Sequence, residues 1–202
     1  MSFALVQSGT IQPESNAVIL AEAIDHLFVV DPEAFPDVQR KLTEAITDAE
    51  GECGCPFVSR QFTYVLDEFP RWRADNPDID VTIRLPMPPC VSIESVKYID
   101  TNGVQQTLAT TEYHKAIRGK PARIVPANGK QWPDTLPGKP ESVEIAFTAG
   151  FGDRTQVPDD IKAAIKLILG DRWRNRGEEG RAERSIPLGA RRILDNYRGH
   201  LL

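Results

Sequence analysis

The spacing of apolar residues changes twice along this chain, and this change limits the fold more than any other feature. Near both ends apolar residues recur every three or four positions, whereas between residues 57 and 150 they alternate with polar ones. The first pattern is typical of helices with one buried face, and the second of strands with one buried face. No single helix can bury such a face alone, so segments from the two ends are expected to pack together.

The predicted fold class is α+β, with a small four-helix bundle formed by the N- and C-terminal helices and an inserted β-rich domain. The bundle is predicted to comprise residues 1–56 and 151–202, and the β-rich module residues 57–150. Helices are expected at 17–28, 36–50, from Pro158 to about Trp173, and 187–198, with Ser15 and Asn16 able to cap the first. The predicted core residues are Ile19, Leu20, Ile24, Leu42, Ile46, Ile161, Ile165, Ile168, Leu169, Trp173, Ile193 and Leu194.

Turn signals divide the β-rich region into strands. In VKYIDTNGVQQTL, Asn102-Gly103 separates two strand-like runs and predicts a hairpin, because both residues tolerate positive φ. Three prolines, Pro86, Pro88 and Pro89, are expected to mark a strand end or a sheet edge.

The stretch FTAGFGDRTQVPDD places glycines between a strand and a helix, the order found in phosphate-binding loops. A dinucleotide loop would need a third glycine where Thr155 stands, with the helix starting at once. Here the helix begins only at Pro158, which lacks an N–H donor, and there is no Gly-Lys-Ser/Thr motif. We therefore interpret Gly150 and Gly152 as a sharp turn out of the sheet.

No set of residues in the sequence indicates catalysis or metal binding. Cys53 and Cys55 lack a second cysteine pair, which favours reduced thiols at a helix end over a zinc site. The adjacent Asp159 and Asp160 point in different directions, and the three histidines share no motif. No cofactor, metal or enzymatic activity is predicted.

Charge is distributed unevenly along the chain. The net charge is −5, yet residues 171–202 hold eight arginines and five acidic residues, so the remainder is strongly acidic. The acidic residues 1–170 argue against a protein that wraps DNA, because the affinity of proteins for DNA comes mainly from basic side chains that neutralise the phosphates. The basic end can contact an acidic protein surface or nucleic acid, or form a solvated helix face.

No apolar run approaches the ~20 residues of a membrane span, and MSFALVQSGT does not resemble a secretion signal. No membrane association is predicted, and we expect the protein to be made in a cytoplasm.

Several stretches together resemble the head–tail connector (adaptor) proteins of long-tailed bacteriophages and related prophages. They are VILAEAIDHL, IRLPMPPCVSIESVKYIDTNGV, PARIVPANGKQWP, VEIAFTAGFGDRTQVPDDIKAAIKLILGDRWRNR and IPLGARRILDNYR. Their order and spacing carry the resemblance, which covers most of residues 17–198.

The resemblance implies a structural virion protein at the head–tail junction, made in the host cytoplasm. Such proteins form a homo-oligomeric ring of twelve subunits that docks under the portal protein, extends the DNA channel and meets the next neck protein, a stopper or tail terminator. DNA would pass without sequence-specific binding. The family's C-terminal helix and tail imply portal docking for Arg191, Arg192, Tyr197, Arg198, Leu201 and Leu202, with the alternative that these residues simply close the bundle.

Two other functions stay open at this point. One is another neck or tail component, such as a head-closure or tail-terminator protein, for which a mainly β structure is expected. The other is a ligand-binding module or small enzyme with a concave site near Tyr113, Arg123 and Trp132.

Overall fold

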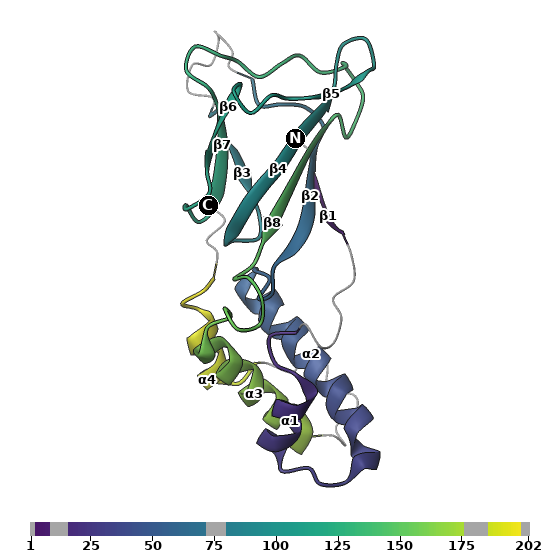
Figure 1. Cartoon of the computed structure of the whole chain (residues 1–202), viewed down its shortest axis with the longest axis vertical. Helices are drawn as coiled ribbons and strands as arrows, with labels where there is room; N and C mark the ends of the chain where they lie inside the picture. Colours follow the sequence, from purple (N-terminus) through teal and green to yellow (C-terminus); the bar gives the residue numbers. More distant parts are fainter. Residues whose placement is uncertain (1–2, 9–15, 72–79, 176–185, 199–202) are drawn as a thin grey trace. The chain divides into compact units, whose positions relative to one another are not determined.

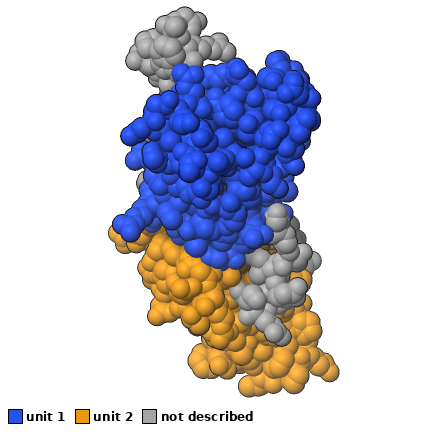
Figure 2. All heavy atoms as spheres, turned by 45° about the horizontal axis from the view of Figure 1, so that its top comes forward, with its two compact units in different colours: residues 1–9, 59–150, 200–202 blue, residues 10–58, 151–199 orange. Residues whose placement is uncertain are grey.

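The structure, a computed structural model, describes residues 3–8, 16–71, 80–175 and 186–198. It contains two compact units, which Figure 2 shows in different colours. The described part of unit 1 comprises residues 3–8, 59–71 and 80–150, and that of unit 2 residues 16–58, 151–175 and 186–198. The described residues form four α-helices and two antiparallel sheets, which confirms the α+β class.

Unit 2 contains the helices, and these come from both ends of the chain (Figure 1). They are α1 (Leu20–Leu27), α2 (Phe35–Cys53), α3 (Asp159–Arg174) and α4 (Leu188–Leu194), with a short 3-10 helix η2 (Pro32–Ala34) before α2. One continuous apolar core connects all four α-helices. Because α1 and α4 have only eight and seven residues, we describe this unit as four helices sharing a core.

The core of unit 2 is built mainly between α2 and α3. Leu42 and Ala45 of α2 and Ile161 and Ile165 of α3 are fully buried. Helix α2 ends at Gly54, whose φ of 64° places it in the left-handed conformation that glycine adopts without strain. Helix α3 begins directly after Pro158, with two aspartates in its first turn, where the helix dipole favours negative charge.

The predicted core residues differ in burial. Seven are buried: Leu42, Ile46, Ile161, Ile165, Ile168, Leu169 and Leu194. Four others are half-buried and pack against this core: Leu20, Ile24, Trp173 and Ile193. Ile19 is half-buried at the position preceding α1.

The start of α1 differs from the prediction. The helix begins at Leu20, three residues later than expected, and Ile19 precedes it without a side-chain cap. Ala17 and Val18 are buried within a bend of the chain. Ser15 lies outside the described residues, and Asn16 is not the N-cap residue, because that position is occupied by Ile19. The apolar residues 17–19 therefore belong to a non-helical segment that packs against the core.

Unit 1 contains both sheets (Figure 1). The five-stranded sheet has the order β1 (Phe3–Ser8), β2 (Arg60–Leu66), β8 (Val143–Ala149), β4 (Cys90–Ile99) and β5 (Gln105–Thr107). The three-stranded sheet has the order β3 (Ile83–Leu85), β7 (Ala122–Pro126) and β6 (Tyr113–Ala116). Every pair of neighbouring strands is antiparallel. Strand β1 was not predicted from the sequence.

The inner faces of the two sheets share one core. Strand β8 alternates buried and half-buried residues along its whole length. Its Phe147 pairs in register with Phe62 of β2, and the two rings stack with centroids 5.7 Å apart. Ile83 and Ile124 of the three-stranded sheet belong to the same cluster. Unit 1 is therefore two packed sheet layers.

The predicted hairpin is confirmed between β4 and β5. Ile99 pairs with Gln105, and the turn between them contains Gly103 with a φ of 81°. The Asp100 carboxylate accepts hydrogen bonds from the N–H groups of Asn102 and Val104, both at 2.9 Å. The predicted proline boundary is also confirmed, because β3 ends at Leu85 and β4 begins at Cys90.

The glycine-rich segment contains a unit boundary, between Gly150 and Phe151. Gly150 and Gly152 have φ values of 130° and 117°, which residues with a side chain rarely adopt. A Cβ at Gly152 would overlap the Gln156 side chain. The Asp153 carboxylate accepts from the N–H groups of Thr155 and Gln156 and thereby occupies donors that a phosphate would use. This geometry is that of a turn.

None of the helices in the described parts of the chain has the length and apolar character that crossing a membrane would require.

The helical core gives a direct test of this fold. Replacing the fully buried Ile165 by alanine leaves a cavity between α2 and α3. We expect the free energy of unfolding of this unit to fall by about 2–5 kcal/mol. Hydrogen exchange followed by mass spectrometry should show faster exchange in α2 and α3 peptides. Leu167→Ala is the matched control, because Leu167 lies on the exposed face of the same helix; equal effects of the two substitutions would contradict this packing.

Candidate functional site

A carboxylate between two arginines fixes the C-terminal segment to α2. Glu52, in the last turn of α2, has a side chain only 14% exposed. Its Oε1 lies 3.1 Å from Arg191 Nε and 2.8 Å from Arg198 Nη2. Arg198 Nε also donates to the Glu52 carbonyl at 3.2 Å. A shared, half-buried carboxylate holds its partners more firmly than an isolated surface pair does.

Tyr197 forms a second attachment, to the start of α3. Its hydroxyl donates to the Asp160 carboxylate, with 2.7 Å to each oxygen. The ring packs edge-on against Phe151, with centroids 5.7 Å apart. Burial and the neighbouring Asp160 carboxylate raise the pKa of Tyr197 to about 12. The hydroxyl is therefore a donor at neutral pH, and together with Arg191 and Arg198 it orients the chain that follows α4.

The thiols near α4 are structural. Cys53 and Cys55 are buried and reduced, and Cys53 Sγ lies 3.5 Å from the Leu194 carbonyl, to which it can donate. The Cys55 side chain and burial both raise the pKa of the Cys53 thiol. Metal binding needs the thiolate form, which these surroundings disfavour. No group of three or more potential ligands that could hold a metal lies within the described residues.

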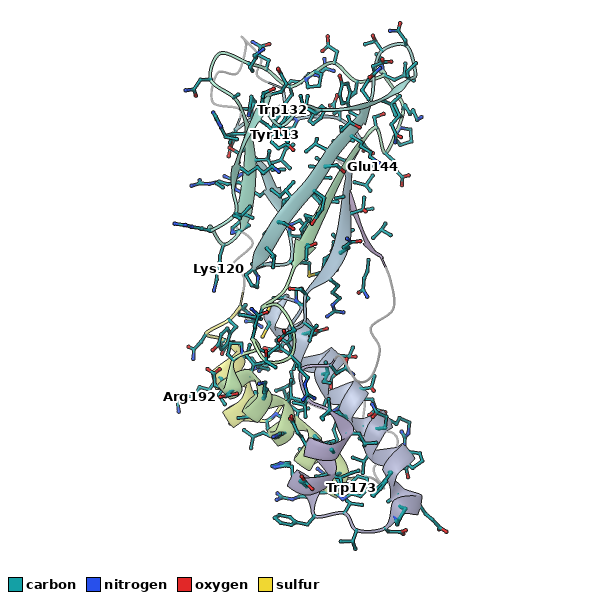
Figure 3. The ribbon with its side chains drawn as sticks, in the orientation of Figure 1. Tyr113, Lys120, Trp132, Glu144, Trp173 and Arg192 are labelled. Carbon is teal, nitrogen blue, oxygen red and sulfur yellow. The ribbon has the colours of Figure 1, made fainter. Side chains whose placement is uncertain are left out.

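The structure brings together three of the predicted docking residues: Arg191, Tyr197 and Arg198. Arg192 lies outside this cluster; it is exposed, and no ion pair is recorded for it among the described residues. Figure 3 shows Arg192 extending from α4 away from α3. The remaining two, Leu201 and Leu202, lie outside the described residues.

Sequence reasoning missed the partners of this cluster, Glu52, Asp160 and Phe151. Glu52 carried a usable signal, because it continues the buried series Val38, Leu42, Ala45 and Ala49 at the same three-to-four spacing. A carboxylate on an otherwise apolar stripe needs a cationic partner. Which arginines supply it depends on the packing of α4 against α2.

The three residues of the alternative ligand site, Tyr113, Arg123 and Trp132, do not face a common cavity. Trp132 is buried, stacks on Phe69 at 4.9 Å and donates its indole N–H to the Val81 carbonyl at 2.8 Å. Tyr113 is also buried, whereas Arg123 is exposed. Arg123 and its register partner Arg84 lie on the outer face of the three-stranded sheet. The three side chains therefore do not line one concave site.

Two hollows occur in the described part of unit 1. One, of about 540 Å³, is lined by Asp67, Glu68, Arg71 and residues 135–140. The other, of about 410 Å³, has Trp132 in its wall, beside Arg71 paired with Asp134 at 2.9 Å. Both walls carry charges of both signs that are already partly paired, so neither hollow indicates a particular ligand.

Comparison with known proteins connects this fold with particle necks. No protein-family model and no curated protein sequence matches the chain. Among solved structures it is similar to a protein in the neck of an empty GTA particle computed with C6 symmetry, with a TM-score of 0.77. That match has 22% sequence identity and covers 98% of this chain and 97% of the other.

Two further structures give the same result. One is the neck of a native GTA particle computed with C12 symmetry, with a TM-score of 0.74, covering 98% of this chain and 97% of the other. The second is the virion of a native gene transfer agent (GTA) particle, with a TM-score of 0.73 and coverage of 98% and 96%. Both are 22% identical to this chain. The chain therefore has the fold of proteins that build gene transfer agent particles, and both of its units are included in the likeness.

The tyrosine contact can be tested through pH. Because the pKa of Tyr197 is raised from its unfolded value near 10 to about 12, the protonated hydroxyl stabilises the fold. This stabilisation is fully present below pH ~10 and is lost as pH rises toward 12. We expect the free energy of unfolding in urea to be roughly 1 kcal/mol higher for wild type than for Tyr197→Phe at pH 8. This difference should become smaller above pH ~10. A difference that does not vary with pH would contradict the contact with Asp160.

Proposed function

We propose that this protein is a structural subunit of the neck of a phage or phage-like particle, a head–tail connector (adaptor) without enzymatic activity. The observation that carries the proposal is the extent of the likeness. It covers 98% of this chain and 97% of a neck protein, so it includes the helices and both sheets in one chain. A shared sheet module alone would be compatible with many functions.

In this proposal the four helices act as a bundle that builds a homo-oligomeric ring of twelve subunits. The similar neck structures were computed with C6 and C12 symmetry, which supports a ring. A ring arises when identical head-to-tail interfaces close by rotation. Unit 2 supports this assignment because all four helices share one core and can present constant flanks to neighbouring copies.

The proposed partners are the portal protein on one side and the next neck protein, a stopper or tail terminator, on the other. DNA passes through the channel without sequence-specific binding, and the net charge of −5 limits its attraction to the phosphates. The proposed location is the head–tail junction of the virion, reached after synthesis in the host cytoplasm.

We propose that the C-terminal segment docks on the portal. Arg191, Tyr197 and Arg198 anchor this segment to α2 and α3, so the chain leaves Arg198 from a fixed point. In this arrangement the three residues position the tail, and Leu201 and Leu202 provide the apolar contact. Docking by Arg192, which is exposed and lies outside the cluster, stays a prediction.

The alternative of a head-closure or tail-terminator protein is less well supported. Such a protein was expected to be mainly β, whereas the described residues include the long helices α2 and α3. A ligand-binding module is disfavoured because Tyr113, Arg123 and Trp132 do not share a site.

Docking is tested by changing the tail and leaving the core intact. Truncation from residue 191 would also remove the buried Leu194 and weaken the helical core. We therefore choose the double substitution Leu201→Ser and Leu202→Ser. The variant should fold like wild type by circular dichroism and lose at least tenfold in affinity for its portal in a pull-down titration, about 1.4 kcal/mol.

The matched control is Val104→Ser, which removes an exposed apolar side chain from the β4–β5 hairpin of unit 1. It should bind portal like wild type. Unchanged portal binding by the tail variant would show that the tail does not dock. A reconstruction of intact particles tests the function itself. The proposed function is wrong if the protein is absent from the position between portal and tail.

A further inference from the structure

Unit 2 exposes four large apolar side chains within its described residues, and they fall into two groups. Phe28 and Val30 lie in the connection between α1 and α2 and are 89% and 91% exposed. Leu167 on α3 and Leu188 on α4 are 46% and 82% exposed. We call Phe28 and Val30 the knob, and Leu167 and Leu188 the receptor patch.

The knob is held in a defined conformation. Phe28 has a φ of 54°, in the left-handed region where glycine is usual after a helix. Its N–H donates to the Asp25 carbonyl at 3.3 Å, and the Val29 N–H donates to the Ile24 carbonyl at 3.2 Å. The Val29 side chain packs against the helical core. The two knob side chains therefore project from a fixed segment.

A phenyl ring at this position is unfavourable for the isolated chain. Glycine would adopt the left-handed conformation with less strain, and an almost fully exposed ring gains little from burial. Val30 is equally exposed, which makes the two residues adjacent apolar projections. Two adjacent apolar side chains this exposed, in a strained backbone conformation, favour a contact outside the chain.

The receptor patch is an exposed apolar area on α3 and α4. Leu167 lies against α4, because a Cβ at Gly189 would be 3.8 Å from Leu167 Cδ1. Small residues, Ala163 and Gly170, lie one turn to either side of Leu167 on α3. They leave the leucine methyl groups uncovered, and Leu188 extends this apolar area on the first turn of α4.

The charges around the two groups are opposite. Asp25, Asp31 and Glu33 surround the knob in sequence and are exposed, and no ion pair is recorded for them among the described residues. Arg192 lies one helical turn after Leu188 and therefore on the same face of α4. Figure 1 shows the α1–α2 connection and α4 at separate places on the helical unit.

We propose that the knob of one copy packs on the receptor patch of the next copy, with the acidic residues of the knob facing Arg192. This inference rests on the proposed ring, and it names the surfaces that would form it. The contact is heterologous, so an open oligomer keeps one unused knob at one end and one unused patch at the other until the ring closes. An aromatic side chain buries only about 150–250 Å². The contact alone is thus far below the ~800 Å² per partner of a stable interface, and it acts as the register-setting part of a larger one.

A weak contact of this kind is best trapped covalently. Val30→Cys and Leu188→Cys are made in full-length chains carrying tags of different size, and the two are mixed under mild oxidation. The three native cysteines are buried and should not interfere. Because a disulfide needs close Cβ atoms, cross-linking reports direct proximity. We expect mixed dimers to exceed either homodimer by about tenfold, and a chain with both substitutions to form a ladder of oligomers.

The matched control pairs Leu188→Cys with Val104→Cys, which is also exposed but lies in unit 1. It should give only collisional cross-links. Adding Phe28→Ser to the Val30→Cys chain should lower mixed-dimer yield by about tenfold, and Arg192→Glu in the other chain should lower it several-fold. Circular dichroism of each variant checks that the loss is not caused by unfolding.

Three results would overturn the inference. The first is a yield of mixed dimers no higher than in the Val104→Cys control. The second is a preference for homodimers cross-linked between two copies of position 30. The third is a cross-link between positions 30 and 188 within a single chain of the double variant. These failures are separate from failure of the proposed function. A particle reconstruction with this protein as a neck ring but no Val30–Leu188 cross-link would remove only the contact. If the cross-links form but the protein is absent from particle necks, only the proposed connector function is wrong.

Discussion

The shared core of helices from the two ends of the chain is the interaction on which the rest of unit 2 depends. Helix α2 supplies Leu42 and Ala45, and α3, more than 100 residues later, supplies Ile161 and Ile165, all fully buried. Neither helix can bury its stripe without the other, because isolated amphipathic helices are marginally stable in water. Strands β2 to β8 occur in the chain between these two halves, so the helical unit can form only after the whole intervening segment has been made.

The proposed functions depend on this core through α4. Helix α4 is too short to be stable alone, and it is held by the buried Leu194, by Glu52 between two arginines, and by the Tyr197–Asp160 hydrogen bond. These contacts hold residues 191–198, which precede the tail proposed to dock on the portal, and they position the exposed Leu188 proposed to meet the next copy. Portal docking and ring formation would thus share one rigid base, while using different surfaces of it.

Sequence spacing predicted some elements well and others poorly, for identifiable reasons. Helices α2 and α3 are long and strongly periodic, and the β4–β5 hairpin has a glycine where positive φ is required. Strand β4 buries Cys90, Ile93 and Val96, three residues apart, because its pairing with β8 shifts register twice. Such spacing resembles a helix. Strand β1 is an edge strand in which, of the residues with described side chains, Leu5 alone packs against the core, so its pattern is weak.

The sequence by itself determined the local geometry of the strongly patterned elements: the helices α2 and α3, the β4–β5 hairpin, and the turns at prolines and glycines. Only the tertiary structure decided the long-range partners. It placed β1 beside β2, joined Glu52 to Arg191 and Arg198, and left Phe28 and Leu188 exposed while similar residues were buried. The physical reason is that periodicity reports the direction of a side chain relative to its own element, whereas pairing depends on which elements meet in space.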